Sequence, residues 1–138
     1  MTPQHDSPIT TVIAPADHLA RAPYFDHTAV GLILHHSIPG AGMYGGILSL
    51  EAHSQLAMHW HEVGEVQYIL QGQGMALDVA GNQRPVATGT TVYSPPGRNG
   101  AHGFVNTEAE PLRILFFYPA PGGMAPTVHV VESRDDTA

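Results

Sequence analysis

The sequence predicts an all-β protein, and three observations support this prediction. The chain has 138 residues, which is the length of one domain. Its 15 glycines and 12 prolines divide it into short segments, as expected for a chain with many turns. The segments between the turns are rich in β-branched and aromatic residues, and only Pro15–Ala22 weakly favours a helix. Many short strands at this spacing are typical of a β-sandwich or barrel rather than of a layered α/β protein.

The first predicted strands lie within residues 9–61. Ile9–Ile13 and Ala29–Ser37 are rich in β-branched and apolar residues, and Pro39-Gly40 supplies a turn after the second run. Gly46–Glu51 and Leu56–His61 follow as short runs in which apolar residues alternate with polar or small ones. Such alternation indicates strands that bury one face.

The middle of the chain predicts strands joined by tight turns. Val66–Gln71 and Met75–Val79 are separated by Gly72-Gln-Gly74, whose glycines suit a hairpin turn. Ala80-Gly-Asn82 has the composition of a further turn. Thr90–Tyr93 is a short β-branched and aromatic run, so we expect a strand there as well.

The last predicted strands are Ala101–Asn106, Leu112–Tyr118 and Thr127–Val131, with turns at Asn99-Gly100 and Pro121-Gly-Gly123. Leu112–Tyr118 is apolar on both faces. A strand of this kind either occupies a central position in a sheet or lies on a dimer surface.

We expect a single domain over residues 1–138, with a core at about 29–131 and loosely ordered ends at 1–8 and 133–138. No run of about 18 apolar residues is present, which argues against a transmembrane helix. The first residues also lack the basic and apolar regions of a signal peptide. The sequence therefore predicts a cytoplasmic protein without a membrane partner.

The composition excludes several kinds of chemistry. The chain has no cysteine, so it can form no disulfide, thiolate nucleophile or cysteine metal site. It also has no lysine, which excludes a Schiff-base mechanism. The net charge of −7 argues against nucleic acid as a partner. The anomaly that remains is the number of histidines, 10 against 12 aspartates and glutamates.

Two of these histidines, His59 and His61, alternate on a predicted strand and precede Glu65 and Gly72. Side chains two residues apart on a strand share a face, with Cα atoms about 6–7 Å apart, so both imidazoles can reach one metal ion. Gly64 can make the turn that brings the Glu65 carboxylate beside them. Roughly 0.003 such patterns are expected by chance in a chain of this composition.

A second segment runs from Gly89 through Pro95 and Gly97 to His102 and Asn106. Together the two segments resemble the paired motifs of the cupin superfamily. The resemblance implies a double-stranded β-helix, or jelly-roll barrel, with one metal inside. It further implies that the metal ligands are His59, His61, Glu65 and His102.

The sequence departs from the family pattern in two places. His53 occupies the position of the leading glycine of the first motif, where it can alter a turn but no ligand. The loop between Gly97 and His102 is longer by two residues. This loop carries Arg98 and Asn99, and it either shapes the mouth of the site or is a tolerated surface insertion.

The resemblance predicts an enzyme that uses one divalent transition metal, Fe, Mn, Ni, Co, Cu or Zn, on a small oxygen-bearing substrate. Four protein ligands leave positions for bidentate chelation of a dicarbonyl, enediol or hydroxy acid. We favour a dioxygenase-type oxidoreductase narrowly over a lyase or isomerase. A non-catalytic cupin that binds a metal and a metabolite is the alternative of a different class, and a barrel with vestigial ligands is a third.

Further residues are candidates through strand alternation. Gln67 shares the face of Glu65, so it is a candidate for a hydrogen bond to the substrate or to one of the metal ligands. Plain packing is the alternative. Tyr118 is a candidate catalytic hydroxyl at the pocket rim, although core packing is the simpler interpretation. Asn106 is expected to secure the backbone.

Trp60 alternates away from the metal side, and an exposed tryptophan there is compatible with the homodimer that the resemblance implies. Glu62 also points away and is a poor general base.

The other histidines have simpler interpretations. His53 is expected on the surface at a strand end, and His129 on the surface or at an interface. His35 and His36 point to opposite faces of one strand, so at most one faces inward. We assign no role to the histidines in segments without periodicity, which are His5, His18 and His27.

Overall fold

The structure, a computed structural model, describes residues 11–13, 20–22, 25–34, 42–121 and 124–131. These residues form strands and a 3-10 turn at Arg98–Gly100, without an α-helix, and none of their helical segments is long and apolar enough to cross a membrane. In chain order the strands are β1 (Ala20–Ala22), β2 (Thr28–Leu34), β3 (Met43–Leu50), β4 (Gln55–Trp60), β5 (Glu65–Gln71), β6 (Gln73–Leu77), β7 (Gln83–Ala87), β8 (Thr91–Ser94), β9 (His102–Asn106), β10 (Leu112–Pro119) and β11 (His129–Val130).

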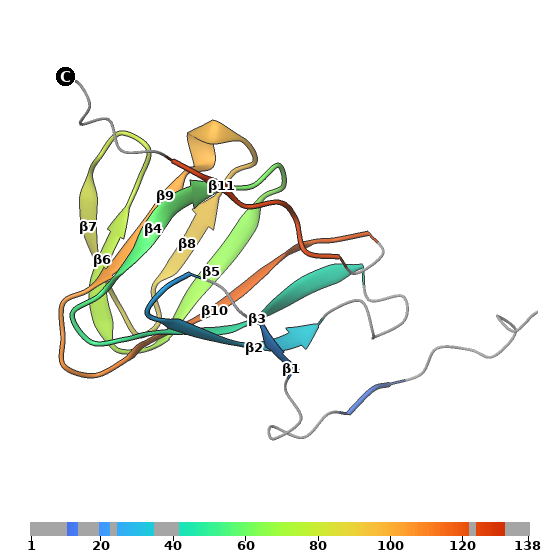
Figure 1. Ribbon diagram of the computed structural model, residues 1–138, viewed down its shortest axis with the longest axis horizontal. Helices are drawn as coiled ribbons and strands as arrows, with labels where there is room; N and C mark the ends of the chain where they lie inside the picture. Colours follow the sequence, from blue (N-terminus) through green and yellow to red (C-terminus); the bar gives the residue numbers. More distant parts are fainter. Residues whose placement is uncertain (1–10, 14–19, 23–24, 35–41, 122–123, 132–138) are drawn as a thin grey trace, which may run out of the picture.

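The strands form two antiparallel sheets that face each other (Figure 1). One sheet has six strands in the order β1-β2-β3-β10-β5-β8, and the other has five in the order β11-β4-β9-β6-β7. The chain crosses between the sheets repeatedly, from β3 to β4, back to β5, and so on to β10. This winding is the double-stranded β-helix that the sequence motifs implied.

Alternating side chains fill the space between the sheets. On β10, Leu112, Ile114 and Phe116 are buried, whereas the residues between them are half-buried on the other face. β10 lies between β3 and β5, so the apolar character of both its faces reflects a central position. Each fully buried large side chain contributes about 1.5–3 kcal/mol to folding. The buried apolar core consists of Val30, Leu32, Leu48, Leu50, Leu56, Ile69, Val86, Phe104, Leu112, Ile114, Phe116 and Tyr118.

The sequence prediction missed one strand between residues 42 and 121, which is β7. Its residues, Gln-Arg-Pro-Val-Ala, show no β-branched run, and only Val86 is buried. β7 is the edge of the five-stranded sheet, where Pro85 lies opposite Met75. A proline is tolerated there because an edge strand can leave one side without backbone donors.

The N-terminal predictions need two corrections. Residues 20–22 of the predicted helix Pro15–Ala22 instead form β1, which pairs with β2. Residues 11–13 of the predicted strand Ile9–Ile13 are not in a strand. The remaining residues of both segments, and 35–37 of the predicted strand Ala29–Ser37, lie outside the described residues. Pairing with the exposed edge of β2 outweighs the weak local preference of Ala-Arg-Ala.

Asn106 ties the two sheets together, as its place in the second motif suggested. Its side-chain amide donates hydrogen bonds to the carbonyls of Leu50 (3.1 Å), Glu51 (3.0 Å) and Glu110 (2.8 Å). Its Oδ1 accepts one from the backbone N–H of Glu108 at 2.9 Å. Asn106 is 1% exposed, so one buried amide satisfies several backbone groups at once.

His53 occupies the position at which the family motif has a glycine. It is exposed in the turn between β3 and β4 and has φ = 54°, a left-handed conformation that glycine adopts most easily. The chain accepts histidine there at a cost of about 1 kcal/mol. The surface position predicted for His53 is therefore confirmed.

Candidate metal centre

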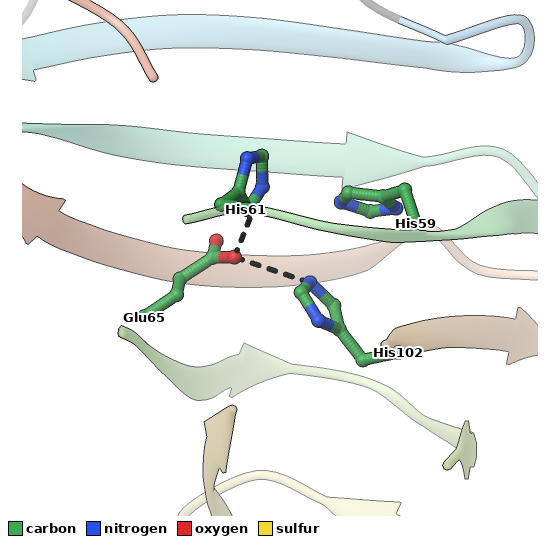
Figure 2. A group of neighbouring side chains, drawn as sticks. All are labelled: His59, His61, Glu65 and His102. Atoms are coloured by element: carbon green, nitrogen blue, oxygen red, sulfur yellow. Dashed lines mark ion pairs between the residues drawn. The ribbon is translucent and has the colours of Figure 1, made fainter. Parts of the chain in front are cut away.

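The four predicted metal ligands meet inside the barrel, where all are buried (Figure 2). His59 lies near the end of β4, and His61 directly follows that strand. Glu65 begins β5 and His102 begins β9, so each strand delivers its ligand at the same end of the barrel. β4 pairs with β9, and His59 lies directly opposite His102 in the register.

Their candidate ligand atoms all lie within 4.8 Å of one another. Glu65 Oε1 is 3.5 Å from His61 Nε2 and 3.1 Å from His102 Nε2. The ring of His59 closes the group, with its centroid 4.4 Å from that of His102 and 5.1 Å from that of His61. Figure 2 shows the three rings and the carboxylate pointing toward a common centre.

The second nitrogen of each histidine is held by the backbone. A carbonyl oxygen only accepts hydrogen bonds, so each Nδ1 must carry the proton and donate. In a neutral ring this leaves Nε2 with a lone pair, which is the form that binds a metal. The Nδ1 atoms of His59, His61 and His102 lie 2.7, 2.9 and 2.9 Å from the carbonyl oxygens of Ala57, Thr127 and Gly100, respectively.

Burial keeps the first two rings neutral. Desolvation, assisted by the neighbouring His102, lowers the pKa of His59 to about 3. Desolvation also lowers the pKa of His61, although the Glu65 carboxylate opposes the shift. The proton therefore does not compete effectively for these nitrogens near neutral pH.

An observation that is independent of the motif also indicates that the site suits a metal ion. His61 Nε2 and Glu65 Oε1 are buried polar atoms without a hydrogen-bond partner in the described part of the chain. Buried acceptors left in this state are costly. A cation between them would satisfy both, and a donor set of imidazole nitrogens with one carboxylate oxygen suits a divalent transition metal.

The long loop before His102 supports two of the candidate ligands through backbone hydrogen bonds. Gly97 N–H donates to the carbonyl of His61 at 2.8 Å. Gly100 is buried, and a Cβ there would lie 1.7 Å from the Pro95 carbonyl oxygen, so only glycine fits. Gly100 then presents its carbonyl to the His102 ring. The loop thus orients a ligand, while its Arg98 and Asn99 side chains are exposed.

A comparison with protein families identifies the architecture. The cupin domain family model matches residues 46–118, which is more than half of the chain and includes all four predicted ligands. The chain is a cupin. A search of curated protein sequences finds no match.

Solved structures resemble this cupin in fold. The polyketide cyclase RemF from Streptomyces resistomycificus has 17% identity and a TM-score of 0.74, covering 92% of this chain and 89% of its own. A sugar phosphate isomerase from Silicibacter pomeroyi has 18% identity and a TM-score of 0.70, covering 88% and 83%. Ectoine synthase from P. lautus has 14% identity and a TM-score of 0.66, covering 93% and 96%. At these identities the likeness establishes the fold alone.

A small cavity of about 20 Å³ lies beside the ligands of this cupin. A space of this size holds about one water molecule. Its lining includes the polar side chain of Gln67, which is 2% exposed. The lining residues are Leu48, Leu56, His59, Glu65, Gln67, His102, Phe104, Ile114 and Phe116.

Gln67 faces the cavity as its alternation with Glu65 predicted. Its Nε2 donates to Ser94 Oγ at 3.3 Å, and Ser94 Oγ in turn lies 3.4 Å from Gln67 Oε1. Ser94 is the one hydrogen-bond partner of this amide among the described residues. The amide therefore keeps one N–H donor for a ligand of the cavity.

Tyr118 lies deeper than the rim that the sequence suggested. It is 2% exposed, and its ring centroid is 5.0 Å from that of His61 and 5.7 Å from that of Tyr44. The residue packs against a ligand ring inside the core, because β10 is central and its inward face is covered. This position agrees with core packing, the simpler of the two interpretations of Tyr118, and not with a place at the rim.

Trp60 points away from the ligands but is half-buried rather than exposed. The ring of His129 stacks on it with centroids 4.1 Å apart. Glu62 is exposed and faces the same histidine, with Oε2 3.4 Å from His129 Nε2, so it takes no place in the cavity. His27 is exposed near Glu51. His5, His18, His35 and His36 lie outside the described residues.

Sequence reasoning missed several groups of the site. The carbonyls of Ala57, Gly100 and Thr127 have no side-chain signal that could reveal them. Ser94 could have been found, because it follows the predicted strand Thr90–Tyr93 and continues its alternation. Phe25, whose ring lies 4.7 Å from that of His59, sits between strands in a segment without periodicity.

Proposed function

We propose that this cupin is a metal-dependent enzyme, a dioxygenase-type oxidoreductase that acts on a small oxygen-bearing metabolite. One observation carries the proposal. Three imidazole nitrogens, each fixed by a backbone carbonyl, converge with one carboxylate in a buried group that has unsatisfied acceptors. Such an arrangement is costly without a metal and well organised with one.

The bound metal, which we expect to be Fe, Mn, Ni, Co, Cu or Zn, would supply Lewis acidity and, if it is redox-active, reactivity toward O2. The protein would hold it with His59, His61, Glu65 and His102. The apolar walls, including Phe104 and Phe116, would keep bulk water away from the reacting oxygens.

Gln67 and Tyr118 are the residues that we place next to the reaction. The free N–H of Gln67 would donate to a substrate oxygen and favour charge that develops there. Tyr118 would act as a positioning residue, because its ring packs against the imidazole of His61. We infer a substrate that presents two oxygens, such as a β-diketone, an enediol or a hydroxy acid, because four protein ligands would leave positions for bidentate chelation.

The test begins with metal analysis of protein purified without a chelator or a histidine-affinity column. O2 uptake is then measured with pentane-2,4-dione and with 2-hydroxy acids. We expect O2 consumption in proportion to substrate loss. Substrate loss without O2 consumption would identify a lyase or isomerase, and stoichiometric metal without any turnover would identify a binding cupin.

Gln67→Leu is expected to lower kcat/KM by about 10–100-fold, because a donor to the developing charge is lost. Its metal content should equal that of the wild type. Gln71→Leu is the matched control, since Gln71 lies on the same strand but is exposed at its end. Equal losses in the two variants would remove Gln67 from the reaction.

A homodimer also belongs to this proposal. The outer face of β5 and β8 exposes Val66 (45%), Tyr68 (39%) and Tyr93 (62%), and Val66 pairs across the strands with Tyr93 and Phe117. An apolar stripe across an antiparallel sheet suits a self-complementary contact. The cytoplasmic location and the absence of nucleic-acid partners stay predictions from the sequence.

Light scattering is expected to give twice the 14.7 kDa of one chain for the wild type. Val66→Glu should reduce the mass to that of the monomer, because it places charge in the contact. Val79→Glu changes an equally exposed valine in a turn away from this face and should leave the dimer intact. A monomeric wild type at micromolar concentration would contradict the dimer.

A further inference from the structure

One ligand of the candidate metal centre depends on a remote segment of the chain. The carbonyls that hold His59 and His102 belong to residues two positions earlier in the sequence. The carbonyl that holds His61 belongs to Thr127, which is 66 residues away. Local chain geometry therefore fixes two of the rings, whereas the third is fixed only when the segment Met124–Val131 is in place. We call this segment the C-terminal strap.

The strap lies along the edge of β4 opposite to β9, and its strand β11 is the outermost strand of the five-stranded sheet (Figure 1). His129 and Val130 pair with Trp60 and His59. The backbone N–H of Val131 donates to the carbonyl of Met58 at 2.9 Å. The strap therefore runs beside the strand that carries the ligands.

The docking of the strap depends on few contacts. Only two of its residues are in a strand, and most of its side chains are exposed or half-buried. Its side-chain contacts include the stack of His129 on Trp60, with an interplanar angle of 16°. Short edge strands with exposed hydrogen bonds are the parts of a fold that open most readily.

We propose that docking of the C-terminal strap and occupancy of the metal centre are coupled, with Thr127 as the positioning residue of His61. This inference rests on the metal centre of the proposed function. With the strap docked, the Thr127 carbonyl fixes the ring so that Nε2 faces Glu65. With the strap open, Nδ1 loses its acceptor, and the ring is free to rotate or to change tautomer.

The coupling works in both directions. A metal on Nε2 withdraws electron density from the ring and makes Nδ1–H a stronger donor to Thr127. Metal binding therefore stabilises the docked strap. Because linkage is reciprocal, a weaker strap lowers metal affinity by the same factor by which the metal stabilises docking.

The first test compares Co²⁺ binding by the full-length wild type, His129→Ala and Val128→Ala. His129→Ala removes the stack on Trp60 but no ligand, and we expect about tenfold weaker Co²⁺ binding. Val128 is exposed in the same strap, so Val128→Ala is the matched control and should bind like the wild type. At saturation the visible spectrum of bound Co²⁺ should be the same in all three, because the ligands are unchanged.

Val131→Pro is a second variant that leaves Trp60 and His129 intact. It removes the N–H that donates to Met58, and it should weaken Co²⁺ binding in the same direction as His129→Ala. Protected amides of β9 and β10 report whether each variant is folded.

Hydrogen exchange tests the other direction. In the wild type, saturating Co²⁺ should slow exchange of the Val131 amide at least tenfold. In His61→Ala, which lacks the ring that Thr127 holds, Co²⁺ should not slow it. Unchanged affinity in both strap variants, or Val131 exchange insensitive to Co²⁺, would overturn the coupling. A wild type that binds no Co²⁺ would instead overturn the metal centre itself.

Discussion

Replacement of His102 with alanine is expected to abolish stoichiometric metal binding while the barrel stays folded. His102 begins β9, and its Nε2 lies 3.1 Å from Glu65 Oε1. The substitution therefore removes one of the three candidate nitrogen ligands. A lost ligand typically weakens a site by more than the 10–100-fold attributed to its supporting groups. The fold should survive, because the core that joins the sheets is apolar and does not include this ring.

The measurement is elemental analysis together with a metal titration of both proteins. His53→Ala is the matched control, since it makes the same side-chain change at an exposed turn, and His53 does not belong to the cluster of candidate ligands. It should retain the metal content of the wild type. Stoichiometric metal in His102→Ala would show that the fourth ligand is assigned wrongly.

Asn106→Leu is expected to destabilise the metal-free protein by about 3–5 kcal/mol, an exceptional cost for one substitution. Leucine has a similar volume but removes the two N–H groups that three carbonyls share, and it leaves the Glu108 N–H without its acceptor. Asn106 is 1% exposed, and a leucine in its place brings no polar atom that could replace the lost hydrogen bonds. For a chain of this length the transition temperature should fall by about 10 °C or more.

Urea unfolding followed by circular dichroism gives the free-energy change directly. Asn82→Leu is the control, because Asn82 also donates through its side chain, to Asp78 at 3.1 Å, but on the exposed surface. Its cost should stay below about 1 kcal/mol. A loss of less than 1 kcal/mol in Asn106→Leu would show that the tie between the sheets is not a main source of stability.

Most of the fold could be predicted from local patterns. Apart from β7, the strands from Gly46 to Tyr118 follow from apolar residues that alternate and from turn residues that separate the runs. The predictions failed where pairing overrides propensity. β7 contains Pro85 and little β-branched character, yet it completes the edge of a sheet, and β1 pairs with β2 although its sequence favours no strand.

The gathering of the four candidate ligands was also accessible from the sequence. His59 and His61 share a face through strand alternation, and the second motif added His102. The same alternation placed Gln67 in the cavity. Alternation alone did not decide between the rim and the core for Tyr118, because depth along a strand depends on which elements cover its end. Nor did it show that His129 covers Trp60, since β11 and β4 are far apart in the chain.

The sequence by itself determined which side chains can bind a metal and on which face of their strands they lie. These properties depend on residue identity and on a period of two, both of which are local. Only the tertiary structure decided which nitrogen of each ring is free, because that is set by the carbonyls of Ala57, Gly100 and Thr127. Every residue carries a backbone carbonyl, so residue identity does not show which carbonyl will bind a ligand ring. The path of the backbone in the folded protein decides this.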